Sequence, residues 1–169
     1  MQRLEEAGVA DKTCIVLTND HYPYGLTEDE YNELAGQTLD TTFEKYRNSF
    51  ICYVPGLSEN IVVDEYCSTA DILPTLLNLF GVDYDSRLLV GRDVFSDTEP
   101  LVLWPEYSWK TDKGTYEAES RTFTPAEGAD VEDGYVERIK AIVSNKISYS
   151  REVQNMKYFQ VLSDYLNGK

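Results

Sequence analysis

Residues 13–18 (TCIVLT) are an uninterrupted run of β-branched and apolar side chains. Such a run predicts a β-strand covered on both faces, as in a sheet with helices on either side. A second run of this kind, residues 48–56 (NSFICYVPG), ends in a Pro-Gly pair. Two strands that need cover on both faces indicate a layered α/β architecture rather than an isolated sheet.

Helical segments alternate with these strands. In residues 27–36 (TEDEYNELAG), Thr27 and Glu30 have the spacing of a capping box, and a glycine closes the segment. Residues 71–81 (DILPTLLNLFG) place apolar side chains on one helical face and also end in glycine. Pro74 is tolerated only in a first turn, so this helix is expected to begin at the start of that stretch.

The last third of the chain has a different pattern. Residues 100–123 predict antiparallel strands that turn at 112–114 (DKG), and residues 135–147 and 151–166 predict two helices. The fold class is therefore α/β, with mainly parallel strands, flanking helices and a small antiparallel sheet. One domain is expected, with residues 1–100 forming the α/β core and residues 101–169 completing it.

The net charge and the cysteine spacing exclude some classes of partner and of metal site. The net charge of -15 excludes a nucleic-acid partner, because phosphate binding needs clustered Lys and Arg. An anionic substrate would need a local cation beside it. Cys14, Cys52 and Cys67 lack zinc-site spacing and are best explained as buried thiols, with a Cys14–Cys52 bridge left open if their strands are neighbours.

The first strand run ends in the polar pair Asp20-His21, and His21 is the only histidine in the chain. A carboxylate and an imidazole together suit Mn, Zn or Fe better than Ca. The following Tyr-Pro-Tyr-Gly supplies the turn that would bring both side chains to one ion. Taken alone, a capping aspartate beside a surface histidine explains the pair better, because a metal site needs more than two protein ligands.

Five segments that occur in this order carry information beyond the Asp20-His21 pair: VLTNDHYPYGL, NSFICYVPGL, STADILPTLLNLFGVDYDSRLLVGRDVF, LVLWPEYSW and SYSREV. Together they resemble the C-terminal half of the lipoteichoic acid synthase-like branch of the sulfatase and alkaline phosphatase superfamily. DILPTLLNLFG and GRDVF are typical of sulfatases. DHYPYG, in place of a shorter DHG, points to the phosphoglycerol transferase branch.

The resemblance implies that Asp20 and His21 bind a catalytic divalent metal, Mn or Mg. In that family the threonine nucleophile, a glutamate ligand and the phosphate-binding residues lie upstream, and this sequence has none of those motifs. No catalytic residue is therefore expected here. The chain is expected to carry about half of the metal site, to lack turnover alone, and to have the missing N-terminal half of the same protein as its partner.

The substrate implied by the resemblance is a glycerophospholipid head group at the extracytoplasmic face of a bacterial membrane, with this segment itself soluble. The choices between transferase and hydrolase, and between phosphate and sulfate ester, stay open. The alternative is a non-catalytic acidic binding or assembly module that retains half of the fold. Such a module would leave the strand at residues 13–18 with an unpaired edge, and it would be expected to self-associate.

Residues near the metal pair have two readings. Tyr24 and Gly25, with Tyr22 before them, could shape the wall of a glycerophosphate pocket, or form a turn with an aromatic lid. Both readings can hold together, because a turn that presents an aromatic ring can also line a pocket.

Other motif residues are expected to be structural. Asp71 and Thr75 are interpreted as helix capping and packing. Gly91, Arg92 and Asp93 could reach the site, but a turn held by an Arg–Asp pair is the favoured interpretation. Three aromatic residues of the antiparallel segment could line a groove, but core packing is the simpler interpretation. They are Trp104, Tyr107 and Trp109.

Overall fold

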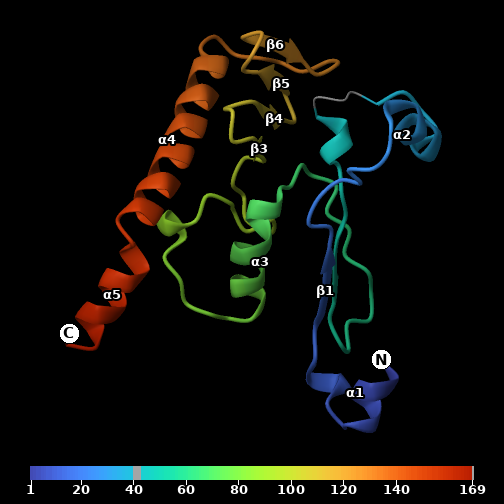
Figure 1. The fold of residues 1–169 in the computed structure, drawn as a ribbon, viewed down its shortest axis with the longest axis vertical. Helices are drawn as coiled ribbons and strands as arrows, with labels where there is room; N and C mark the ends of the chain where they lie inside the picture. Colours follow the sequence, from blue (N-terminus) through green and yellow to red (C-terminus); the bar gives the residue numbers. More distant parts are fainter. Residues whose placement is uncertain (40–42, 169) are drawn as a thin grey trace. The chain divides into compact units, whose positions relative to one another are not determined.

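A computed structural model describes residues 1–39 and 43–168 (Figure 1). The chain divides into two compact units, Met1–Ile61 and Val62–Lys169. Each unit is described by itself below. Within the described ranges, no helix is both long enough and apolar enough to cross a bilayer.

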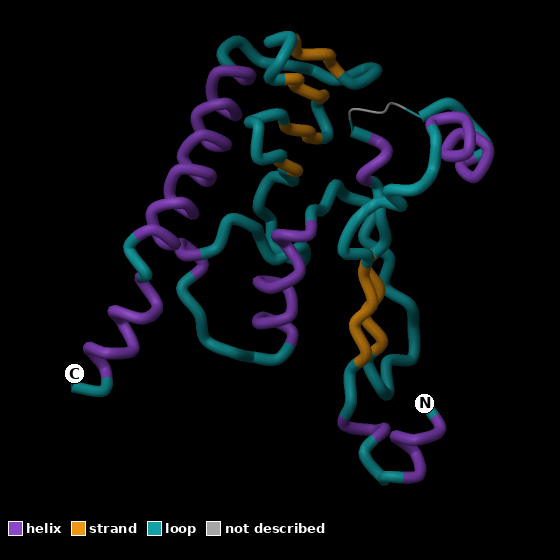
Figure 2. Tube along the Cα trace, in the orientation of Figure 1, coloured by secondary structure: helices purple, strands orange, loops and turns teal. Residues whose placement is uncertain are grey.

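The first unit is built around a two-stranded antiparallel ribbon, drawn in orange in Figure 2. The pairing runs in register from Ile15 opposite Tyr53 to Thr18 opposite Phe50. The helices and strands of this unit are α1 (Gln2–Glu6), β1 (Ile15–Thr18), α2 (Glu28–Ala35) and β2 (Phe50–Tyr53). Single 3-10 turns cover Ala10–Lys12 and Glu44–Tyr46.

Helix α2 forms where its local signals predict. The Thr27 hydroxyl accepts a hydrogen bond from the Glu30 backbone N–H at 3.4 Å, and the Glu30 carboxylate accepts from the Thr27 N–H at 2.8 Å. The predicted capping box is therefore present. Gly36 ends the helix with φ of 67°, a left-handed conformation that glycine adopts without the Cβ clash of other residues.

The ribbon corrects two expectations about the first strands. Mainly parallel strands were predicted, but every strand pair in the described ranges is antiparallel. Cover on both faces was also predicted, yet Leu17 is 57% exposed and Ile51 56% exposed. An apolar strand sequence indicates that other parts of a protein must bury the strand. It does not indicate whether the strand pairs in parallel or antiparallel fashion, because that depends on the path of the connecting chain.

The second unit packs a long helix against a four-stranded antiparallel sheet of order β3-β4-β5-β6. Its elements are the 3-10 turns Thr69–Asp71 and Ser86–Leu88, α3 (Ile72–Leu79), β3 (Val102–Leu103), β4 (Trp109–Thr111), β5 (Gly114–Glu117), β6 (Thr122–Pro125), α4 (Tyr135–Asn155) and α5 (Tyr158–Leu166). Figure 1 shows α4 running alongside the sheet. The buried core joins the two: Trp109, Tyr116, Tyr135, Ile139 and Val143.

Several predictions are confirmed in this unit and one boundary is wrong. The sheet is antiparallel and turns before Gly114, and α3 begins at Ile72, as expected. A new helix was predicted from Arg151, but α4 continues to Asn155 and the break falls at Lys157. Lys157 has φ of 49°, a left-handed conformation in a residue type that gives no sequence signal for it.

The α/β fold class is confirmed, with the strand direction corrected as above. The division at residue 100 stays a prediction. Strands β1 and β2 are neighbours, the condition set for a Cys14–Cys52 bridge, but all three cysteines are free thiols. Cys52 lies opposite Val16, so Cys14 is offset along the ribbon from the position that would face it.

Candidate functional site

Asp20 and His21 follow β1 after one intervening residue, Asn19, where the chain leaves the ribbon and turns. The Asp20 side chain is 90% exposed and the His21 side chain 44% exposed. The turn places both side chains on the same side, as the sequence analysis required for a shared ion. Their carboxylate and imidazole are therefore adjacent and accessible.

The orientation of His21 fixes which ring nitrogen is available. His21 Nδ1 lies 2.6 Å from the backbone oxygen of Tyr22. A carbonyl oxygen only accepts, so Nδ1 carries the proton and donates. In the neutral ring Nε2 then keeps its lone pair. Histidine ligands of metals are commonly held in this way, by an N–H bond from the other ring nitrogen to a carbonyl.

The distance between the two side chains fits a shared metal. His21 Nε2 lies 3.5 Å from Asp20 Oδ1. Two ligands bound at about 2.1 Å in tetrahedral geometry are about 3.4 Å apart. The pair therefore has the donor types and the separation of two ligands of one divalent ion.

Two ligands do not complete a metal centre. Among residues 1–39 and 43–168, no group of three or more His, Cys, Asp and Glu side chains is arranged to hold a metal.

An aromatic cluster adjoins His21, and only part of it was predicted. Tyr24 stacks on the His21 ring with centroids 4.2 Å apart and planes at 13°, and Tyr22 meets Tyr24 edge-on at 4.8 Å. Tyr46, 22 residues beyond Tyr24 along the chain, also meets Tyr22 edge-on at 5.3 Å. Lys45 Nζ lies 5.4 Å from the Tyr22 ring centroid. The aromatic cluster next to His21 is therefore larger than DHYPYG alone suggested, and its role as a lid stays a prediction.

Tyr31 joins this cluster from α2. Its hydroxyl donates to the Pro23 backbone oxygen at 3.3 Å, which ties the turn to the helix. Partial desolvation and the nearby Tyr22 raise the pKa of Tyr31, while Lys45 opposes the shift. Gly25 has open space around the position of a side chain, so packing alone does not explain a glycine there. Sequence reasoning missed Tyr31 because its contacts depend on how the turn folds back.

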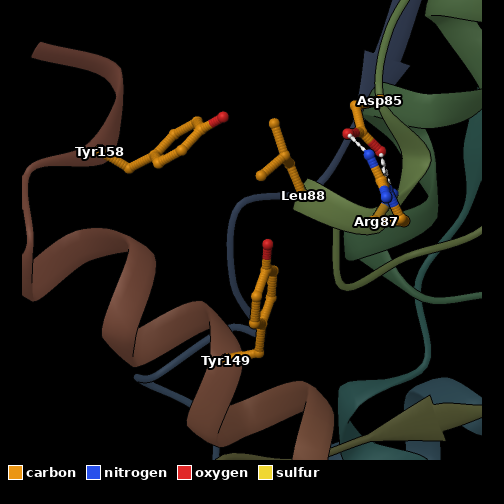
Figure 3. Close-up of a pocket in the computed structure, with 5 residues that line it drawn as sticks. All are labelled: Asp85, Arg87, Leu88, Tyr149 and Tyr158. Carbon is orange, nitrogen blue, oxygen red and sulfur yellow. Dashed lines mark hydrogen bonds and ion pairs between the residues drawn. The ribbon is translucent and has the colours of Figure 1, made fainter. Parts of the chain in front are cut away.

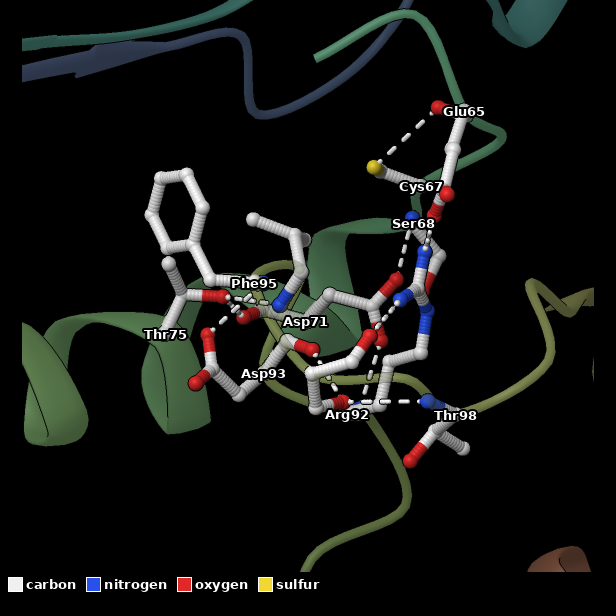
Figure 4. Close-up of polar contacts among 11 residues, drawn as sticks. Glu65, Cys67, Ser68, Asp71, Thr75, Arg92, Asp93, Phe95 and Thr98 are labelled. Atoms are coloured by element: carbon white, nitrogen blue, oxygen red, sulfur yellow. Dashed lines mark hydrogen bonds and ion pairs between the residues drawn. The ribbon is translucent and has the colours of Figure 1, made fainter. Parts of the chain in front are cut away.

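In the second unit, Asp71 is the centre of a buried polar network (Figure 4). Its carboxylate accepts hydrogen bonds from the backbone N–H groups of Ser68 and Arg92, both at 2.7 Å. Its carbonyl accepts from the Thr75 hydroxyl at 2.6 Å, and that hydroxyl accepts from the Val94 N–H at 3.1 Å. These bonds hold the α3 N-terminus against residues 92–94, so the packing role of Thr75 is confirmed. The capping role expected for Asp71 is wrong for α3, because its side chain makes no cap bond to that helix and instead accepts from Ser68, the N-cap of the preceding 3-10 turn.

The expected Arg92–Asp93 pair is wrong. The buried guanidinium of Arg92 instead donates to Glu65 at 2.8 Å and to the Ser96 carbonyl at 3.4 Å. Asp93 accepts from the Asn78 side chain at 2.6 Å. Adjacent residues at a turn point in different directions, and the true partner of Arg92 is 27 residues away, beyond the range of local patterns.

Two aromatic residues of the antiparallel segment, Trp109 and Tyr107, differ in their burial. Trp109 is fully buried and stacks on Tyr116 with centroids 5.5 Å apart, so core packing is confirmed for it. Tyr107 lies outside the strands, has φ of 75° and is 38% exposed. The core-packing interpretation is therefore wrong for Tyr107.

An open cavity of about 410 Å³ lies at the C-terminal helices, where Tyr149 of α4 and Tyr158 of α5 face Leu88 (Figure 3). Asp85 and Arg87 complete its lining. The Arg87 side chain and backbone donate to the Asp85 carboxylate and lower its pKa to about 2. Both charged groups are thus already paired with each other.

Comparison with known proteins gives consistent matches. The Sulfatase family model matches residues 1–82, which include Asp20 and His21. Lipoteichoic acid synthases of Staphylococcus aureus strains USA300 and NCTC 8325 are each 33% identical over 98 residues, 55% of this chain. That match spans 15% of the length of these curated relatives.

The crystal structure of the lipoteichoic acid synthase LtaP from Listeria monocytogenes superposes with a TM-score of 0.70 at 22% identity. The match covers 91% of this chain and 41% of the LtaP chain. The likeness shows a shared fold, including the α/β arrangement expected from the sequence. Sequence and fold comparisons agree: residues 1–82 match the Sulfatase family model, and the chain is similar to lipoteichoic acid synthases in sequence and in fold.

Proposed function

We propose that this chain supplies Asp20 and His21 to the divalent-metal site of an enzyme of the phosphoglycerol transferase type. The observation that carries the proposal is the geometry of His21, with Nδ1 held by the Tyr22 carbonyl and Nε2 3.5 Å from Asp20 Oδ1. A capping aspartate beside a surface histidine would need neither feature. The proposed substrate is a glycerophosphate-type head group, and the proposed metal is Mn or Mg.

Each residue of the turn has a role in this proposal. The Tyr22 carbonyl fixes the His21 tautomer, and Tyr24 keeps the imidazole plane in place by stacking. Asp20 adds the negative charge that favours a divalent over a monovalent cation. A bound divalent ion would neutralise charge on a phosphoryl oxygen and lower the pKa of an attacking hydroxyl. Tyr24 and Gly25 would then border the glycerol moiety of the substrate.

The nucleophile and the other ligands are proposed to belong to further polypeptide of the same sulfatase-type domain. This chain spans only a minor part of the relatives it matches. The exposed apolar side chains of the β1–β2 ribbon support the proposal, because each strand has a free edge and uncovered faces. The proposed location of the complete enzyme is the outer face of a bacterial membrane.

The single histidine makes the metal proposal directly testable. The carbon-bound ring protons of His21 are the only such protons in the chain, so their NMR signals need no assignment by mutation. Titration with Mn²⁺ is expected to broaden these signals early. Asp20→Asn should raise the Mn²⁺ concentration needed for the same broadening several-fold, because it removes the charged ligand.

The matched control is Asp130→Asn, which makes the same change at an exposed loop position. It should leave the His21 broadening at the wild-type level, because it changes only the diffuse negative surface charge. Equal effects of the two variants would show that Mn²⁺ is attracted by net charge alone, and the metal assignment would fail.

A separate assay tests whether this chain alone contains all the residues that catalysis needs. The 169-residue chain is expected to show no phosphodiester hydrolysis with a chromogenic substrate and Mn²⁺. Robust turnover that disappears in His21→Ala would show that the chain needs no further residues for catalysis.

The alternative of a non-catalytic assembly module makes a different prediction for the ribbon. If pairing of the ribbon with a second copy is its function, light scattering should show a discrete dimer at low micromolar concentration. Leu17→Lys should dissociate that dimer, because it places a charge on the exposed strand. A monomer across the concentration range would argue against self-pairing.

A further inference from the structure

A cavity of about 190 Å³ in the second unit is not used by the proposed metal site. Its apolar wall includes Ile139 and Ile142 of α4, and its polar wall includes Asp71 and Arg92. Lys146, one turn beyond Ile142 on the same helix face, completes the polar side. Two cations therefore line a small, partly enclosed space.

Arg92 adds a buried positive charge to the cavity wall. Its side chain is only 7% exposed, and its Nε is buried without a hydrogen-bond partner among the described residues. The rest of the guanidinium is held by Glu65 and the Ser96 carbonyl. This Nε has almost no accessible surface, so the contribution of Arg92 to the cavity wall is its positive charge.

The Lys146 ammonium makes fewer hydrogen bonds than it can donate. Its ammonium donates to the Val90 carbonyl at 2.6 Å and has no ion-pair partner within the described ranges. Two of its three N–H groups remain for other acceptors. Burial lowers the pKa of Lys146 and the Asp71 charge opposes that shift, so the ammonium lacks its usual hydration.

The carboxylates that line the cavity are already engaged. Asp71 accepts from two backbone N–H groups. Glu99 accepts from the Arg138 guanidinium at 3.0 Å and from the Tyr135 hydroxyl at 3.4 Å. Lys146 therefore remains on the cavity wall as a cation without an ion-pair partner among the described residues.

We propose that this cavity binds a small oxyanion, either phosphate or a carboxylate, between Lys146 and Arg92. The oxyanion would accept from Lys146 Nζ and lie against the positively charged Arg92 side chain, which lines the cavity. The apolar wall of Ile139 and Ile142 would limit its size. The proposal rests on residues of the second unit alone and does not depend on the metal assignment of Asp20 and His21.

The test is calorimetric titration of the full chain with inorganic phosphate and, separately, with acetate. At least one of the two should bind saturably. Lys146→Met, which keeps length and removes the charge, should weaken binding at least roughly tenfold, the effect of losing a charge-assisted hydrogen bond. Ile142→Phe should also weaken binding, because it fills the cavity without changing charge.

Arg151→Met is the matched control. It removes one positive charge from an exposed position on the same helix and should leave the affinity unchanged. Helix content by circular dichroism should match wild type in every variant used. Binding of phosphate alone, or of acetate alone, supports the site and identifies its ligand. Absence of saturable binding with both anions, or an equal loss in Arg151→Met and Lys146→Met, would overturn the proposal.

Discussion

The packing of residues 91–94 against the α3 N-terminus makes Gly91→Ala a sharp test of the second unit. A Cβ at Gly91 would overlap the carbonyl oxygen and carbon of Ala70 and lie 2.7 Å from the Asp71 backbone nitrogen. All three atoms are backbone, so no side-chain rotation can make room. Either the 91–94 segment or the start of α3 must move.

The cost can be assembled from two effects. Forcing an extra methyl into a packed site costs about 1–3 kcal/mol. Separation of the two segments also weakens the 2.7 Å bond from the Arg92 N–H to the Asp71 carboxylate, a charged hydrogen bond of about 1.5–3 kcal/mol. Together the free energy of unfolding should fall by about 3–5 kcal/mol, a large share of the stability of an ordinary domain.

The assay is urea unfolding followed by tryptophan fluorescence. Both tryptophans, Trp104 and Trp109, lie in the second unit, so their emission reports that unit. With a slope of about 2 kcal/mol per molar urea, the midpoint of Gly91→Ala should fall by about 1.5–2.5 M.

Gly128→Ala is the control for this experiment. Gly128 has φ of 73° and nothing within 4 Å of its would-be Cβ, so alanine there adds only left-handed strain of about 1–2 kcal/mol. If Gly91→Ala lowers the midpoint by no more than Gly128→Ala, the close approach of Gly91 to Ala70 does not contribute to stability and the reasoning fails.

Three further outcomes are expected. Thr27→Ala should cost about 1 kcal/mol of local α2 stability by removing its cap, measured by amide exchange of that helix. Arg87→Gln should raise the pKa of Asp85 from about 2 toward its usual value in a carboxyl NMR titration. Because the pKa of Asp85 is lower in the folded than in the unfolded protein, the Asp85–Arg87 pair contributes its full stabilisation above the unfolded pKa, and this is lost as the pH falls toward 2. Only the wild type should show this loss, because Arg87→Gln lacks the pair. Thr75→Val leaves the Val94 N–H without an acceptor and should lower stability by about 1–3 kcal/mol in urea unfolding.

Short-range patterns predicted the elements whose causes are short-range. The α2 cap needs only Thr27 and Glu30, three residues apart, and the turn before Gly114 needs one tripeptide. The order of elements predicted the fold class, because alternation of buried strands and amphipathic helices has few layered solutions. The metal role of the adjacent pair Asp20-His21 was predicted from the family resemblance and not from a local pattern, and it stays a prediction.

Features that depend on distant contacts were missed. Glu65 binds Arg92 across 27 residues, and Tyr46 reaches Tyr22 only because the chain returns to the turn. The helix break at Lys157 was missed for another reason, since lysine is not a residue type that predicts a left-handed conformation. The antiparallel direction of β1 and β2 depends on the return path, on which the composition of the strands has no bearing.

The β1–β2 ribbon has a consequence for the behaviour of the chain in solution. Its strands, IVLT and FICY, carry no charged residue and no proline, and they combine β-branched and aromatic side chains on accessible edges. Segments of this composition can stack into intermolecular cross-β structure when they are left uncovered. Any protein surface that covers the ribbon therefore also protects the chain from fibril formation. The same strand edges are nucleation sites for aggregation when the ribbon is uncovered.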